Sequence, residues 1–192
     1  MVFEQIKVGI MENFSYLIGD KKEGALIDPG WDSQKLLKIA GKKRLKINKV
    51  LLTHSHYDHL NDLEEITKET KAQVFIHQLE TFENKNIEIK YIKDNDIINV
   101  GNIKIQVIHT PGHSRGSVCF LFDQKLLTGD TLFIGSIGRV DLEGGSEGEM
   151  FQSLKKLSEL DNKIEVYPGH HYSDPLKSTI GQEKANNPFM KF

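Results

Sequence analysis

Residues 53–59 read Thr-His-Ser-His-Tyr-Asp-His, so three of the chain's eight histidines and a carboxylate fall within six positions. Imidazole nitrogens and carboxylate oxygens are common ligands of divalent metal ions. Side chains at positions i, i+2 and i+4 of extended backbone share a face, so we expect His54, His56 and Asp58 to point the same way. We expect His59 to lie in the first turn of a following helix. Burying three imidazoles without a partner is costly, which disfavours a loop with incidental histidines. The segment therefore predicts two neighbouring metal sites.

Three later loops each add one ligand-type side chain directly after a predicted strand. His113 and His170 each follow a Pro-Gly pair, and Asp130 follows Thr-Gly. Functional groups collect at the carboxyl ends of strands in α/β sheets, and glycine lets two backbones approach closely. Each loop alone is a weak indication, but together with residues 53–59 the loops indicate one metal centre.

The candidate metal ligands are His54, His56, Asp58, His59, His113, Asp130 and His170. Seven ligands exceed what one tetrahedral ion can use. If Asp130 bridges two ions, the other six ligands divide into two sets of three. These sets are His54, His56 and His113 for one ion, and Asp58, His59 and His170 for the other. Asp58 is also assigned as the catalytic residue. A donor set of nitrogen and oxygen suits Zn²⁺, Fe or Mn, and we expect two divalent ions, with Zn²⁺ as the metal.

The motif at residues 53–59, followed by His, Asp and His loops in this order, resembles the metallo-β-lactamase superfamily pattern T-H-x-H-x-D-H. Residues 129–133, 135–139 and 187–189 are similar to those of short hydrolases of the glyoxalase II type. The resemblance covers nearly the whole chain. It implies an α/β fold, an αββα sandwich in which two mixed β-sheets pack together with helices on their outer faces.

The resemblance also implies substrate-binding residues. Tyr172 matches a tyrosine with which glyoxalase II contacts its substrate, and Arg139 stands where that family has a lysine. Glyoxalase II carries a C-terminal helical domain that helps to hold glutathione, whereas only 22 residues follow His170 here. We therefore expect one domain over residues 1–192, without a separate substrate domain. The best-known β-lactamases of the superfamily use a cysteine ligand, but Cys119 lies in an apolar segment and is predicted to be packed core.

The predicted reaction is hydrolysis of an acyl thioester of the hydroxyacylglutathione kind. A metal-bridged hydroxide forms near neutral pH because bound metal lowers the pKa of water to about 7, and it would attack the acyl carbonyl. A thiol of pKa about 8.5 leaves as thiolate without obligatory protonation. The expected partner is thus a small-molecule thioester.

Two other functions use the same residues. His54, His113 and Asp130 alone form a two-histidine, one-carboxylate set, and Gly-Arg after the aspartate loop resembles persulfide dioxygenases of this superfamily. That alternative is a mononuclear non-haem iron enzyme. A structural metal module is disfavoured, because structural sites are closed and usually rich in cysteine.

The elements that position these loops follow from hydrophobic periodicity. Strands are predicted at residues 2–8, 14–18, 24–28, 47–52, 74–77, 103–108, 117–122, 125–127 and 164–167. Helices are predicted at residues 33–41, 60–70, 149–160 and 174–184. The polar stretch 87–99 is predicted to be edge strand and loop. His77 and His109 are interpreted as structural residues, and His171 as a neighbour of the centre at most.

Composition excludes several classes of protein. With 38% apolar and 27% charged residues the chain is too apolar for a disordered protein. A net charge of −2 without a basic stripe argues against nucleic acid as a partner. The longest apolar run, residues 118–122, is far below the roughly 20 residues that cross a bilayer, so no membrane partner is expected. A single cysteine and no secretory signal indicate a cytoplasmic protein.

Overall fold

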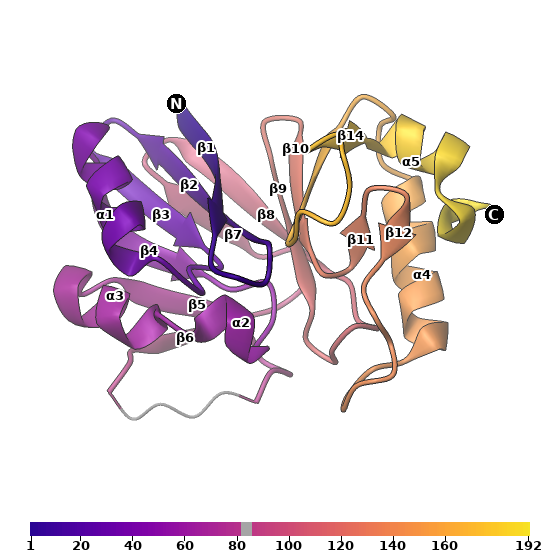
Figure 1. The fold of residues 1–192 in the computed structure, drawn as a ribbon, viewed down its shortest axis with the longest axis horizontal. Helices are drawn as coiled ribbons and strands as arrows, with labels where there is room; N and C mark the ends of the chain where they lie inside the picture. The colour runs from indigo at the N-terminus through magenta and orange to yellow at the C-terminus, as the bar shows by residue number, and fades with distance from the viewer. Residues whose placement is uncertain (82–85) are drawn as a thin grey trace.

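The computed structural model describes residues 1–81 and 86–192, and two six-stranded β-sheets form its middle (Figure 1). In spatial order the first sheet holds β1 (Val2–Val8), β2 (Asn13–Asp20), β3 (Glu23–Ile27), β4 (Lys46–Leu51), β5 (Gln73–His77) and β6 (Ile89–Ile92). Strands β1 to β3 pair antiparallel, and β3 to β6 pair parallel. The first sheet is therefore mixed.

The second sheet is also mixed. In spatial order it holds β14 (Ser178–Thr179), β13 (Glu165–Pro168), β10 (Lys125–Gly129), β9 (Val118–Phe122), β8 (Ile103–His109) and β7 (Ile97–Val100). Only β10 and β13 pair parallel, and the other neighbours pair antiparallel. Because β8, β10 and β13 run in one direction, their carboxyl ends meet at one edge of the sheet. A separate hairpin consists of β11 (Leu132–Phe133) and β12 (Ser136–Ile137).

Helices cover the two outer faces (Figure 1). The first sheet carries α1 (Ser33–Lys42), α2 (Tyr57–Leu60) and α3 (Leu63–Thr70). The second carries α4 (Glu147–Ser158), α5 (Ile180–Asn186) and a 3₁₀ helix (Pro188–Met190). The predicted αββα sandwich is confirmed. None of the described helices is long and apolar enough to span a membrane.

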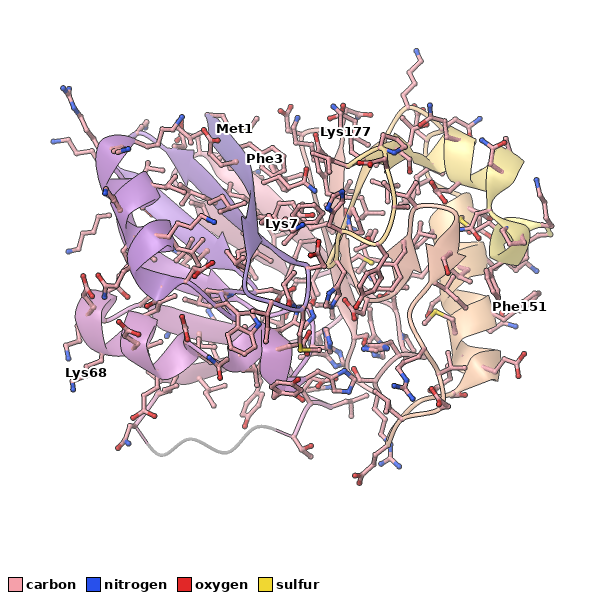
Figure 2. The ribbon with its side chains drawn as sticks, viewed as in Figure 1. Met1, Phe3, Lys7, Lys68, Phe151 and Lys177 are labelled. Carbon is pink, nitrogen blue, oxygen red and sulfur yellow. The ribbon has the colours of Figure 1, made fainter. Side chains whose placement is uncertain are left out.

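Alternating side chains on the strands create three apolar layers. On β2, Tyr16 packs between the two sheets, whereas Leu17 faces the layer beneath α1 and α3. On β9, Phe120 packs between the sheets and Cys119 faces α4. Phe3 closes the upper end of the layer between the sheets (Figure 2). Cys119 is fully buried, and burial raises the pKa of its thiol to about 11, so the prediction that it belongs to the core is confirmed.

Several predicted boundaries are wrong. The helix expected over 174–184 begins only at Ile180, because Thr179 caps it by accepting the backbone N–H of Gln182 and the preceding residues form β14. The helix expected over 60–70 begins only at Leu63, because Leu60 is the last residue of the separate helix α2. The prediction of edge strand and loop over 87–99 is confirmed, since β6 and most of β7 lie in this stretch, at the edges of different sheets. The chain therefore passes there from one half of the fold to the other.

Candidate metal centre

The predicted ligands emerge where strands of both sheets end. Residues 53–59 follow β4 of the first sheet, whereas His113, Asp130 and His170 follow β8, β10 and β13 of the second. The centre therefore lies between the sheets, at one end of the sandwich. The backbone N–H of Phe14 donates to the carbonyl of Gly169 (2.8 Å), which joins the sheets beside His170.

One group of ligand-type residues consists of His54, His56 and His113. Each offers a ring nitrogen, and the three nitrogens lie within 4.8 Å of one another. His54 and His113 are 1% and 2% exposed, whereas His56 is partly exposed. Because only His56 reaches solvent, this residue marks the open side of the group.

A second group consists of Asp58, His59 and His170. Asp58 Oδ2 lies 3.5 Å from His59 Nε2 and 3.3 Å from His170 Nε2. The two Nε2 atoms are 3.3 Å apart. All three residues are buried, so their ligand atoms converge away from bulk water.

The Asp130 carboxylate lies between the two groups. Its Oδ1 is 3.4 Å from His59 Nε2, and its Oδ2 is 3.4 Å from His170 Nε2 and 3.6 Å from His113 Nε2. The backbone of Gly169 lies close to this carboxylate. A Cβ at this position would be 2.3 Å from Asp130 Oδ1, so only glycine fits there. Asp130 thus reaches both groups at once.

Two observations indicate that these residues can bind divalent metal ions. Three buried atoms at the centre, His54 Nε2, His113 Nε2 and Asp130 Oδ1, have no hydrogen-bond partner. Buried polar atoms without partners are rare and need an explanation. Ligand atoms bound to one tetrahedral ion at about 2.1 Å stand about 3.4 Å apart, close to the spacings around Asp130. The donor types, their spacing and these atoms without partners therefore make the His/Asp cluster a candidate site for divalent metal ions.

The other nitrogen of each buried ring faces an oxygen. His113 Nδ1 lies 2.8 Å from the Arg139 carbonyl, and His170 Nδ1 lies 2.9 Å from the Met11 carbonyl. A ring that donates through Nδ1 presents Nε2 as an unprotonated ligand, as histidines at metal sites commonly do. These carbonyls therefore orient the two histidines.

Asp28 and Asn13 support the centre, and both escaped the sequence analysis. Asp28 accepts the backbone N–H and hydroxyl of Thr53 (2.8 and 2.7 Å), and its Oδ2 lies 3.1 Å from His59 Nδ1. Asn13 donates to Asp58 Oδ2 (2.9 Å). The Asp-Pro-Gly at the end of a predicted strand was the only signal for Asp28, and it also reads as an ordinary turn.

The acids and histidines shift one another's pKa values. Burial lowers the pKa of His59, but the carboxylates of Asp130 and Asp28 together outweigh burial and raise it well above its usual range. Burial likewise opposes the charged form of His170, yet the two carboxylates raise its pKa to about 9. Burial and the neighbouring His59 hold the pKa of His54 well below its usual range. A cation that binds here therefore displaces protons from His59 and His170.

The expected common face of His54, His56 and Asp58 is wrong. Helix α2 begins at Tyr57, and His56 is its N-cap in extended conformation. The extended stretch therefore ends before Asp58, whose side chain joins His59 and His170 instead. The division of ligands between two ions that the sequence suggested agrees with these two groups, and it stays a prediction, since a third group of mutually close ligand atoms joins His54, His59 and Asp130.

The two predicted substrate residues lie near the centre in different ways. The Tyr172 ring stacks on His170, with centroids 4.7 Å apart. The Arg139 guanidinium is exposed and pairs with both oxygens of Asp141 (2.8 Å each). The carbonyl of Arg139, not its side chain, contacts the candidate ligand His113. Their substrate roles stay predictions.

The remaining histidines lie outside the ligand groups. The rings of His77 and His109 stack on each other, with centroids 4.1 Å apart. His171 contacts the exposed carboxylates of Glu12 and Asp174. None of the three belongs to a metal-ligand group among the described residues.

Comparison with known proteins relates most of the chain to one superfamily. The family model described as the metallo-beta-lactamase superfamily matches residues 9–170. A Bacillus subtilis protein named as the probable polyketide biosynthesis zinc-dependent hydrolase PksB is 33% identical over 184 residues, which cover 93% of this chain and 82% of that protein. The hydroxyacylglutathione hydrolase of Francisella tularensis subsp. novicida is 34% identical over 165 residues, 84% of this chain and 64% of that enzyme.

Two solved structures share the fold closely. ETHE1 from Myxococcus xanthus superposes with a TM-score of 0.88 at 29% identity, covering 98% of this chain and 84% of that one. The protein TTHA1623 in a di-iron-bound form superposes with a TM-score of 0.85 at 30% identity, covering 97% of this chain and 99% of that one. Similar proteins are thus named with zinc and with iron.

Proposed function

This chain belongs to the metallo-beta-lactamase superfamily of metal-dependent hydrolases, and on that premise we propose that it cleaves small-molecule acyl thioesters with two bound metal ions. The observation that carries the proposal is the Asp130 carboxylate, which lies between two groups of three ligand-type residues. In this proposal Asp130 bridges the ions, with His54, His56 and His113 on one side. Asp58, His59 and His170 hold the other ion.

Divalent ions in such a site activate water near neutral pH and polarise a carbonyl group. The protein's own residues supply the orientation. The Asn13 amide donates a hydrogen bond to Asp58 Oδ2. This contact orients the carboxylate to which we assign the catalytic role. The partly exposed His56 leaves the centre accessible to substrate from one side.

The thioester assignment rests on the relative named hydroxyacylglutathione hydrolase and on leaving-group chemistry. A thiol of pKa about 8.5 departs as thiolate without a proton donor, so hydrolysis needs no general acid. Tyr172 stacks on His170 and carries 61% exposure, so its phenol can contact the thiol carrier. Burial of part of the ring and the Asp130 charge raise the pKa of this phenol to about 12, and it therefore stays a hydrogen-bond donor.

We propose Zn²⁺ as the metal. The donor set contains nitrogen and oxygen atoms and no thiolate, which suits zinc as well as iron and manganese. The name of the Bacillus subtilis relative favours zinc, whereas the di-iron form of TTHA1623 makes iron the competing choice.

The test combines metal analysis with two assays on protein purified without added metal. We expect close to two ions per chain and hydrolysis of at least one of three probes: hydroxyacylglutathione, an acyl-coenzyme A and a simple alkyl thioester. Oxygen uptake with a persulfide serves as the counter-assay. One iron per chain together with oxygen uptake would instead support the mononuclear dioxygenase.

A further inference from the structure

Glu80 is a buried carboxylate that belongs to neither ligand group. It lies in the loop after β5 and is 8% exposed. Burying a carboxylate is costly unless hydrogen bonds satisfy its oxygens. The hydrogen-bond donors around Glu80 therefore identify the segments that it connects.

Each oxygen of Glu80 accepts hydrogen bonds from a different segment. Oε2 accepts the backbone N–H of Ser55 (2.8 Å) and the Ser55 hydroxyl. Oε1 accepts the Ser114 hydroxyl (2.6 Å) and the backbone N–H of Gly116 (2.9 Å). The carboxylate therefore joins a loop of the first sheet to a loop of the second.

Both segments carry metal-ligand histidines. Ser55 lies between His54 and His56, and Ser114 directly follows His113. All three histidines of one ligand group thus stand next to residues that Glu80 binds. The second group is supported by other residues among those described. Asn13 donates to Asp58, and the Met11 carbonyl lies next to His170 Nδ1.

The contact depends on a glycine. A Cβ at Gly116 would lie 2.7 Å from Glu80 Cγ and 2.8 Å from its Oε1, closer than real Cβ atoms approach. The sequence therefore leaves room for the carboxylate next to the His113 loop.

We infer that Glu80 is a positioning residue that fixes the spacing between His54, His56 and His113 and so sets the affinity of this group for its metal ion. The inference rests on the proposed two-metal centre. Replacing a carboxylate that orients ligands at a metal site costs about 10- to 100-fold in metal affinity.

The test is Zn²⁺ titration of chelator-treated protein by calorimetry, in two backgrounds that isolate the groups. Asp58→Ala breaks the group of Asp58, His59 and His170 and keeps the group of His54, His56 and His113, whereas His56→Ala does the reverse; His54, His59 and Asp130 remain in both backgrounds. We expect Glu80→Gln to weaken Zn²⁺ binding at least 10-fold in the Asp58→Ala background. In the His56→Ala background we expect less than about a threefold change. An amide can replace only one acceptor oxygen, and its NH₂ faces the donors of the other loop.

Glu183→Gln is the matched control. Glu183 is also buried and also joins two segments, since it accepts the backbone N–H of Gly135 (2.8 Å) and the Asn187 amide (2.9 Å). Within the described part of the chain, its hydrogen bonds reach none of the segments on which the three histidines lie, so we expect unchanged Zn²⁺ affinity in both backgrounds.

Ser55→Ala keeps the inference testable if Glu80→Gln does not fold, because it removes one donor and leaves the carboxylate in place. We expect a weaker loss, about threefold or more, confined to the same group. Equal losses in both backgrounds, or no loss in either, would overturn the inference. If instead the proposed function is wrong, the unmodified chain would bind Zn²⁺ weakly or hydrolyse none of the thioesters.

Discussion

At the scale of single residues, the two ring nitrogens of the buried histidines His113 and His170 contact different groups. His113 and His170 direct Nδ1 to backbone carbonyls and Nε2 to Asp130. The backbone thus orients the rings, and the carboxylate faces their Nε2 atoms. A change at the carboxylate should therefore affect metal binding far more than folding.

We expect Asp130→Asn to lose metal while the circular dichroism spectrum stays near native. An amide is a poor bridge and cannot offset the repulsion between two cations, whereas the apolar layers of the fold do not involve this residue. Elemental analysis and circular dichroism measure the two effects. Cys119→Ser is the control, and its metal content should equal that of the unmodified chain because the thiol lies in a separate apolar layer. Full turnover with two ions in Asp130→Asn would contradict the bridge.

Arg139 provides a second prediction for a single residue. If its guanidinium binds an anionic group of the thiol carrier, Asp141 competes for the same N–H groups. Arg139→Ala should then raise KM about 10-fold for carriers with a carboxylate, and Asp141→Asn should lower it. Steady-state kinetics on glutathione, coenzyme A and alkyl thioesters measure both. Equal small effects on all three substrates would remove Arg139 from the substrate site.

At the scale of elements, the start of α2 decides which ligands meet. Successive side chains are about 100° apart in a helix and about 180° apart in a strand. Because the helix begins at Tyr57, Asp58 turns away from the face shared by His54 and His56. The same change from extended to helical backbone places His59 next to Asp130.

The C-terminal elements depend on Asn187. Its buried amide donates to the carbonyls of Phe133 and Ser136 in the β11–β12 hairpin and to Glu183 in α5. We expect Asn187→Ala to lower the free energy of unfolding by about 2 to 3 kcal/mol, since it leaves buried carbonyls without donors. Urea denaturation measures the loss. Asn186→Ala, at the exposed neighbouring position, should change stability by less than about 0.5 kcal/mol, and an equal loss there would refute the role of Asn187.

At the scale of the whole molecule, His77 and His109 join the two halves of the fold. His77 ends β5 of the first sheet, His109 ends β8 of the second, and their rings stack. His77 Nδ1 accepts the backbone N–H of Leu79 (3.3 Å), so the neutral ring fits the contact. Burial and the neighbouring His109 lower the pKa of His77 to about 4.

This lowered pKa predicts that acid destabilises the protein. Between pH 6.5 and about 4 the unfolded chain holds a proton on His77 that the folded chain does not, so stability falls as pH falls through this range. Urea denaturation at pH 7 and pH 4.5 should show a smaller decrease for His77→Gln than for the unmodified chain. Equal decreases would exclude His77 as the titrating group.

The sequence by itself determined the local features of this protein. Residues 53–59 and the three later loops indicated metal ligands, because ligand types and strand ends can be read from neighbouring residues. Alternation of apolar residues indicated the strands, as the opposite faces of Tyr16 and Leu17 illustrate. The resemblance to the superfamily then provided the αββα arrangement of layers.

Only the tertiary structure decided which distant residues meet. Glu80 reaches Ser114, 34 residues away, and the Arg139 carbonyl reaches His113, 26 residues away. Neither contact has a local pattern, since a carbonyl exists at every residue and a glutamate in a loop is usually exposed. The side of the centre that Asp58 joins depended on one helix start. These contacts follow from the packing of two sheets, which brings loops together whose positions along the chain are unrelated.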